Sequence, residues 1–332
     1  MKKIKLSTIL LIAALAAFVI IIPMVNEGYT MLVLNTALIF AIATYGISIM
    51  LGLGGMMSFA AVAFMGVGAY ITGNLTSGRW GFVMDSMLAL LLSIIGTAVV
   101  AAVFGFILLR LSGTYFTFAT IGLVQVAYAF YLNYKPLFGG PDGISNIATI
   151  RIFGWSPANY NEWFYVLCAF VLIVALLVER IRKSQLGRSL SAIRDNEIAA
   201  FTLGIDVYRT KVIAFTIAGT LAGLAGALYA MHGAFVCADL FSYERATTYV
   251  IMAMLGGVNN TIGIFIGSVL VTMLPEWLRT LQQYLQLMYG IGIILLMVFM
   301  PDGLAGLAKK LIQSFDRKNR NKGGNDKKEV RE

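Results

Sequence analysis

The chain has 332 residues, of which 59% are hydrophobic and 12% are charged, and its mean hydropathy of +0.83 excludes a soluble globular fold. The formal net charge of +9 does not indicate a nucleic-acid partner, because most basic residues lie in the first five residues, in segment 179–211 and after residue 308. The composition predicts an all-α integral membrane protein, a polytopic helical bundle of about 8–10 transmembrane segments with broken or re-entrant helices among them.

Apolar runs, free of charge except for Glu162 at the start of one of them, predict the membrane spans in chain order. They cover residues 6–25, 31–51, 52–76, 86–109, 113–134, 162–178, 212–236, 247–258, 261–275 and 282–300. The first run follows MKKIK, but it is about 20 residues long and no A-x-A-like site follows it, so we interpret it as an uncleaved helix. Runs 247–258 and 261–275 are shorter than the ~17 residues that a crossing needs, and they form either two crossings or a re-entrant pair.

The distribution of Lys and Arg predicts the orientation in the bilayer. With the N- and C-termini in the cytoplasm, 20 of the 25 basic residues lie on the cytoplasmic side. The other five are Arg79, Lys135, Arg151, Arg245 and Arg279. We therefore expect a transmembrane domain over residues 1–308, with a cytoplasmic loop at 179–211, and a basic, disordered tail over residues 309–332.

Two polar stretches are candidates for a substrate path. Gly52, Gly54 and Gly55, followed by Ser58, either allow close helix packing or break the helix so that its freed backbone lines a cavity. Around residues 114–125, hydroxyl and amide side chains lie beside aromatic ones, which suits an uncharged path for an amphiphilic solute. The candidate path residues are Ser58, Thr114, Tyr115, Thr117, Thr120 and Gln125. Threonines that bond to their own helix backbone explain the second stretch equally well.

The turn after the fifth predicted span is rich in turn-forming residues. We expect it on the outer side, as a gate or as a docking edge for an external protein, with Gly139, Gly140, Asp142 and Gly143 as its candidate residues.

Apart from Glu162, the first residue of run 162–178, no Asp, Glu, Lys or Arg lies inside a predicted span, so buried ionisable groups of the kind that couple ion-driven carriers are absent from the interior of the spans. The single histidine, His232, is predicted near the outer end of its span. The chain also has no G-x-x-x-x-G-K-[ST] phosphate loop, which argues against an ATPase and predicts that energy for transport comes from another subunit. We expect no catalytic residue, no bound cofactor and no metal site.

Segment 179–211 carries seven Lys/Arg and four Asp/Glu between two blocks of predicted spans. After a flexible lead-in at Ser184, Gln185 and Gly187, the apolar residues recur at helical spacings. These residues are Leu190, Ile193, Ala199, Ala200 and Leu203. Gly204 is a candidate helix stop, so one short amphipathic helix is predicted across the cytoplasmic end. The alternative is a solvated positive-inside loop without a partner.

Residues 197–204, EIAAFTLG, resemble the EAA loop of ABC importer permeases, although Ile198 separates the acid from the alanines. Together with LSGTYFTFATIGLVQV, GGPDGIS and the block 184–230, they resemble LivM-type permeases of branched-chain amino-acid ABC transporters over roughly residues 30 to 305. The resemblance implies that this segment docks on an ATPase. The candidate ATPase-coupling residues are Arg188, Arg194, Asp195, Glu197, Ala199, Ala200 and Gly204.

The same resemblance implies a bacterial inner-membrane permease that moves leucine, isoleucine and valine inward. It also implies a second LivH-type permease, two cytoplasmic ATP-binding subunits that use the ATP, and an extracytoplasmic solute-binding protein. Three alternatives stay open: a permease for urea or short amides, an ion-coupled or passive carrier, and a non-transporting membrane scaffold.

Overall fold

The computed structural model describes residues 23, 28–152, 154–277, 287 and 290. Its elements in chain order are α2 (Tyr29–Ser48), the π-helix η1 (Ile49–Leu53), α3 (Ala61–Thr76), α4 (Ser86–Leu108), α5 (Thr114–Asn133), α6 (Lys135–Phe138), the 3-10 helix η2 (Gly140–Asp142), β1 (Ile144–Ser145), α7 (Tyr160–Lys183), α8 (Gln185–Asp195), α9 (Glu197–Thr202), α10 (Val207–Gly233), β2 (Phe235–Val236), the 3-10 helix η3 (Ala238–Phe241), α11 (Tyr243–Gly256) and α12 (Thr261–Trp277). Almost all of the predicted first and last spans and the whole predicted tail lie outside the described residues.

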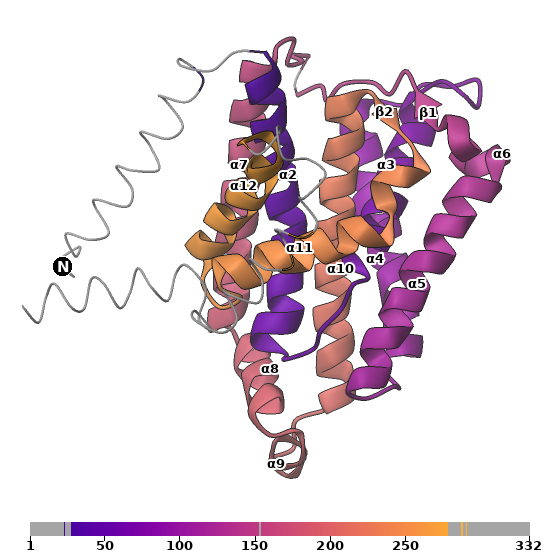
Figure 1. The fold of residues 1–332 in the computed structure, drawn as a ribbon. Helices are drawn as coiled ribbons and strands as arrows, with labels where there is room; N and C mark the ends of the chain where they lie inside the picture. Colours follow the sequence, from indigo (N-terminus) through magenta and orange to yellow (C-terminus); the bar gives the residue numbers. More distant parts are fainter. Residues whose placement is uncertain (1–22, 24–27, 153, 278–286, 288–289, 291–332) are drawn as a thin grey trace, which may run out of the picture.

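The long helices run side by side as a bundle (Figure 1). Within the described residues, five helices are long and apolar enough to cross a membrane: α2 with η1, α4, α5, α7 and α10. The most apolar window is 89% buried in α2 and 72% buried in α10, against 22–28% in α4, α5 and α7. The bundle therefore has α2 and α10 at its centre and three outer helices with exposed apolar faces, which confirms the predicted all-α polytopic membrane class.

Glycines bring α3 and α10 into backbone contact. A Cβ added at Gly226 would overlap the carbonyl oxygen of Met65, and one added at Gly68 would overlap that of Gly223. No side chain fits between the two helices at these points, which is how small residues allow transmembrane helices to approach closely. Polar side chains add to this packing, since Ser93 of α4 donates a hydrogen bond to the carbonyl oxygen of Gly68 at 2.9 Å.

The predicted span 52–76 is wrong at its start. The second helix continues to Leu53 by π-type bonding, residues 54–60 are not helical, and α3 begins only at Ala61. We call residues 54–60 the unwound segment. Gly55 lies there at φ +65°, in the left-handed region that favours glycine. The sequence allowed either close helix packing or a helix break at these glycines, and the structure shows a helix break at Gly54 and Gly55.

Helices α11 and α12 form a hairpin. Gly256 lies against the backbone of Gly263, and Gly257 turns the chain at φ +93°. With 14 residues, α11 is about 21 Å long, too short to cross a ~30 Å hydrocarbon core, and it runs across the long helices rather than along them (Figure 1). This geometry favours the re-entrant pair over two crossings. The predicted boundary at 247 is also late, because Glu244 and Arg245 already belong to the first turn of α11.

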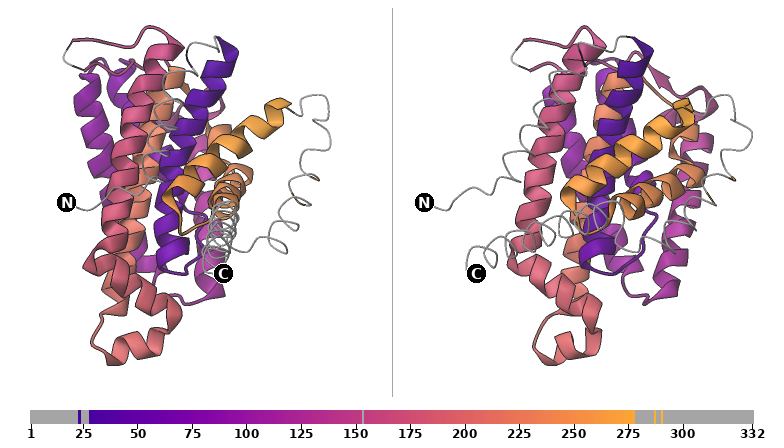
Figure 2. Two further views of the ribbon diagram at one scale, coloured as in Figure 1. Left: turned by 90° about the vertical axis from the view of Figure 1, so that its left-hand side faces the viewer. Right: turned by 60° about the vertical axis from the view of Figure 1, so that its left-hand side comes forward.

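The two ends of the bundle differ. At one end, β1 pairs with β2 in antiparallel register, Ile144 opposite Val236, which fastens the loop after α6 to the end of α10. At the other end, α8 and α9 extend beyond the long helices in both views of Figure 2. Residues 184–206, which hold α8 and α9, are called the projecting segment below.

Candidate functional site

The projecting segment contains two helices, so the prediction of one helix running from Arg188 to Leu203 is wrong. Asn196 lies between them in an extended conformation, and its side chain accepts a hydrogen bond from the backbone nitrogen of Ala199 at 3.0 Å. The expected flexible lead-in is also wrong, because Ser184 caps α8 and Gly187 lies buried against the carbonyls of Ile181 and Arg182. Both differences come from side-chain caps, which end or begin a helix where apolar spacing alone shows continuity.

The apolar residues of the predicted face separate into two groups. Leu190, Ile193 and Ala200 are buried against the rest of the chain, whereas Ala199 and Leu203 are exposed. The predicted helix stop at Gly204 is confirmed, since its φ is +82° and its nitrogen donates to the carbonyl of Phe201 at 3.0 Å.

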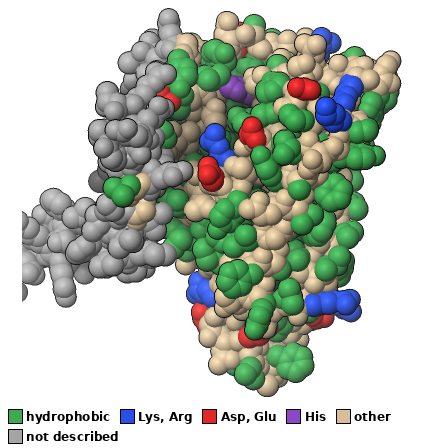
Figure 3. Space-filling view, turned by 45° about the vertical axis from the view of Figure 1, so that its right-hand side comes forward, with side chains coloured by type: hydrophobic (Ala, Val, Ile, Leu, Met, Phe, Trp, Pro, Cys, Tyr) green, Lys and Arg blue, Asp and Glu red, His purple; other side chains and the backbone are tan. Residues whose placement is uncertain are grey.

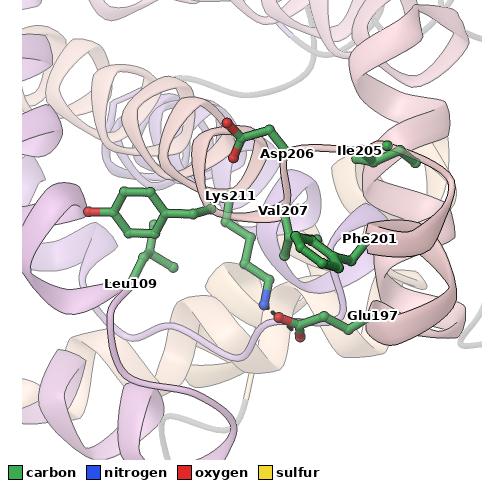
Figure 4. Close-up of a pocket in the computed structure, with 9 residues that line it drawn as sticks. Leu109, Glu197, Phe201, Ile205, Asp206, Val207 and Lys211 are labelled. Atoms are coloured by element: carbon green, nitrogen blue, oxygen red, sulfur yellow. Dashed lines mark hydrogen bonds and ion pairs between the residues drawn. The ribbon is translucent and has the colours of Figure 1, made fainter.

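An open cleft of about 640 Å³ lies between α9 and the start of α10. Within it, Glu197 and Lys211 point toward each other, and Lys211 Nζ donates to Glu197 Oε2 at 2.8 Å (Figure 4). The lysine side chain is 13% exposed and the carboxylate 54% exposed. This ion pair holds α9 in a fixed position beside α10.

The pair should show energetic coupling. We expect Glu197→Gln and Lys211→Gln to lower the melting temperature of the purified protein by similar amounts, because each removes the same bond. The double variant should be no less stable than either single one, and the coupling should be near the upper end of the about 0.2–1 kcal/mol typical of partly exposed pairs. Additive losses in the thermal unfolding measurement would show that the two side chains act independently.

Both candidate coupling arginines are exposed, but each also binds a backbone carbonyl oxygen of this chain. Arg194 Nη1 donates to the carbonyl oxygen of Gly52 at 2.7 Å, and its guanidinium also pairs with Asp195 at 3.1 Å. Arg188 donates to the carbonyl of Lys183 at 2.8 Å, within its own part of the chain. Arg194 is therefore directed at the membrane bundle rather than at the open end.

Asp195, Glu197, Ala199 and Gly204 are exposed, but the large apolar residues beside them were not among the candidate coupling residues. Ile198, Phe201 and Leu203 are 78%, 70% and 81% exposed on the short α9 and the residue after its end. Figure 3 shows apolar side chains at this tip, beyond the charged ones. A signal was present in Ile198, the residue that interrupts the EAA-like pattern. Exposed clusters of large apolar residues on a polar end of a protein mark interaction surfaces.

Half of the predicted path residues meet at the unwound segment. Thr117 Oγ1 donates to the carbonyl of Met57 at 3.1 Å, and Thr120 Oγ1 accepts from the backbone nitrogen of Phe59 at 3.2 Å. Ser58 is 7% exposed in the same segment. Thr120 also donates to the carbonyl of Thr117, as the alternative of local bonding predicts. These hydroxyls therefore satisfy backbone groups that the helix break leaves without helical partners.

The remaining path residues do not join this cluster. Thr114, Tyr115 and Gln125 are exposed on α5, with Tyr115 at 75%. Within the described part of the chain they line no common cavity with Ser58, so the predicted stripe is not one continuous surface.

The turn at residues 139–143, predicted on the outer side and called the outer turn below, is tightly packed. Gly139, Gly140 and Gly143 all have positive φ, and a Cβ added at Gly143 would overlap the carbonyl oxygen of Val236. Asp142 is exposed. The glycines are thus explained by the conformation of the turn and by its close packing against β2. Of the four candidate residues, Asp142 alone has a side chain that a partner could bind.

Two further polar residues lie on α10 and α11. His232 is mostly buried, with Nε2 3.2 Å from Asn35 Nδ2 and its ring edge-on to Trp163. Arg245 of α11 is exposed. Among the residues that the structure describes, no group of three or more His, Cys, Asp or Glu side chains is arranged to hold a metal ion.

Comparison with known proteins gives one family. The sequence model of the family described as "Branched-chain amino acid transport system / permease component" matches residues 29–301. The chain is 27% identical to the high-affinity branched-chain amino acid transport system permease protein LivM of Escherichia coli (strain K12), with 90% of this chain and 75% of the relative covered. It is 28% identical to the protein of the same description from Salmonella typhimurium (strain LT2), with 86% and 72% covered.

The family also contains relatives with another described role. The chain is 28% identical to the autoinducer 2 import system permease protein LsrC of Klebsiella pneumoniae, over 59% of this chain and 56% of the relative. No solved structure matches the chain.

Proposed function

This chain belongs to the branched-chain amino acid ABC transport permease family as a LivM-type member, and from that membership we propose that it forms half of the membrane pathway of an importer for leucine, isoleucine and valine. The partners proposed are a LivH-type permease, two cytoplasmic ATP-binding subunits and an extracytoplasmic binding protein. ATP is used by the partner subunits.

The observation that carries the coupling part of this proposal is the exposed apolar tip of the projecting segment. Ile198, Phe201 and Leu203 present large apolar side chains to the outside of the bundle, surrounded by charged residues. Buried apolar anchors with a polar rim are typical of protein–protein contacts. An ATPase subunit with an apolar recess would bind these three side chains and move α9 when it closes on ATP.

The charges of the described residues support a cytoplasmic position for this end. It carries eight basic residues: Arg110, Arg180, Arg182, Lys183, Arg188, Arg194, Arg209 and Lys211. The opposite end carries Arg79, Lys135 and Arg151. By the positive-inside rule, the projecting segment lies in the cytoplasm and the outer turn with Asp142 faces the binding protein.

In the proposed cycle, a loaded binding protein docks at the outer turn and ATP closes the partner ATPases. The closure displaces α9 and α8, and the unwound segment and the α11–α12 hairpin shift with them. The pathway then changes the side to which it is open. No ionisable side chain is needed to drive this step, because nucleotide hydrolysis in the partners supplies the energy.

The substrate is tested by competition. In cells or vesicles with the complete importer, deletion of this chain should abolish ATP-dependent uptake of labelled leucine. Excess isoleucine or valine should compete with the leucine, and excess urea should not. Competition by urea alone would favour the amide permease, and uptake without ATP would favour a carrier.

Autoinducer 2 is a second candidate solute, because the LsrC relatives are permeases of its import system. Inhibition of leucine uptake by excess autoinducer 2 would favour it. Unchanged solute uptake after deletion would favour a scaffold without transport activity.

A further inference from the structure

One arginine side chain of the projecting segment reaches the end of the second helix, where the unwound segment begins. Arg194 Nη1 donates to the carbonyl oxygen of Gly52 across 142 positions of sequence, at 2.7 Å. Next to this bond, Gly55 leaves room for the arginine stem, since a Cβ added there would lie 2.6 Å from Arg194 Cγ. A charge-assisted hydrogen bond to a carbonyl that has left the helical pattern is both strong and specific.

Gly52 lies at the same time against the turn of the α11–α12 hairpin. A Cβ added at Gly52 would overlap the carbonyl oxygen of Val258 and lie 3.0 Å from Asn259 Oδ1. The break in the second helix is therefore enclosed between Arg194 on one side and the hairpin turn, residues 257–260, on the other.

A second contact joins the hairpin to the end of α7, just before the projecting segment. Arg182 donates to the carbonyl of Asn259, and Glu179 Oε2 accepts from Thr261 Oγ1 at 3.2 Å. Tyr45 of α2 donates to the carbonyl of Thr261 at 3.0 Å. Hydrogen bonds thus connect the hairpin turn and the start of α12 to α7 and α2. The bond of Arg194 connects α8 to the end of the second helix.

We propose that Arg194 is a positioning residue that fixes the projecting segment to the carbonyl of Gly52, directly before the helix break, so that α8, the break and the hairpin turn move as one body. This inference rests on the proposed function and refines it: Arg194 acts inside the permease and does not bind the ATPase. Movement of α9 is then passed through α8 to the two interrupted helices of the bundle. Because these interruptions have few backbone bonds of their own, they are the parts that a small displacement can rearrange.

The matched variants are Arg194→Gln, Arg194→Lys and Arg209→Gln. Arg209 is exposed at the same end and pairs with the nearby Asp206, the cap residue of its own helix, so its variant controls for loss of a surface charge. In the complete importer, Arg194→Gln should lower leucine transported per ATP hydrolysed by about tenfold, the effect of one lost charge-assisted bond. The amount of ATPase subunit that co-purifies should stay unchanged. Arg194→Lys should fall between Arg194→Gln and the wild type, because an ammonium retains the charge without the fork of donors.

A measurement on the permease alone tests the contact without transport. In a Cys168→Ser/Cys237→Ser background, Met57→Cys places a thiol in the unwound segment, where Met57 is 38% exposed. Release of the segment by Arg194→Gln should speed maleimide labelling of this thiol by about tenfold, and Arg209→Gln should not. If Arg194→Gln is not recovered as folded protein, Asp195→Asn, which removes the carboxylate that orients the guanidinium, should change labelling in the same direction.

Unchanged labelling and an unchanged transport ratio in Arg194→Gln would overturn the inference. The inference would also be overturned if Arg194→Gln lost the ATPase subunit while the complex that remained transported a normal amount of leucine per ATP hydrolysed. Arg194 would then be a docking residue. Failure of the wild-type chain to co-purify with any ATPase would overturn the proposed function instead. The labelling measurement would still test whether Arg194 holds the helix break in place.

Discussion

Gly226→Val is expected to prevent the permease from accumulating in folded form. Gly226 of α10 lies against the carbonyl of Met65 in α3, and backbone cannot move aside as a flexible side chain can. Inserting two methyl groups and a Cβ there must separate two helices that form the core of the bundle. The cost should exceed the about 1–3 kcal/mol of ordinary overpacking, because the obstacle is main chain.

The matched control is Gly122→Val. Gly122 lies in the middle of α5, and a Cβ added there meets nothing within 4 Å. Since valine is no worse than glycine in a helix, this variant should accumulate and melt like the wild type. Membrane-fraction yield and thermal unfolding of the detergent-purified proteins measure both effects. Equal behaviour of the two variants would show that the α3–α10 contact does not limit stability.

Phe201→Asp is expected to abolish ATP-dependent uptake while leaving the permease folded. The side chain is 70% exposed, so the substitution disturbs little within the chain. In the proposed complex, it would place a charge in the apolar centre of the ATPase contact. Loss of such an anchor costs at least about 2 kcal/mol, or roughly 30-fold in affinity, and a buried unpaired carboxylate costs more. Ile198→Asp should act in the same way.

The control for this prediction is Val83→Asp. Val83 is 67% exposed in the loop before α4, at the opposite end of the bundle, so the same charge is added far from α9. Affinity purification through the permease should recover ATPase subunit with Val83→Asp and lose it with Phe201→Asp. Retention of the subunit by Phe201→Asp would exclude α9 as the main contact.

Several features of the candidate site follow from local sequence. Gly204 ends the projecting segment because glycine adopts positive φ without a Cβ clash, and that property belongs to the residue itself. Residues 179–211 were recognisable as a polar interruption because charge separates them from the apolar runs. The break near Gly54 and Gly55 was predictable only as one of two outcomes, since other glycines of the chain serve close packing, as Gly68 and Gly226 do between α3 and α10.

The sequence by itself determined the membrane class, the long helices and the polar segment between them, because hydropathy and backbone preference act over a few neighbouring residues. Only the tertiary structure decided that Arg194 faces Gly52, that Ile198 and Phe201 face outward, and that α11 lies across the bundle. A carbonyl acceptor has the same chemistry at every position, so no sequence pattern marks the one that a distant guanidinium will bind. Exposure of an apolar residue likewise depends on which other helices pack against it, and that is a property of the whole bundle.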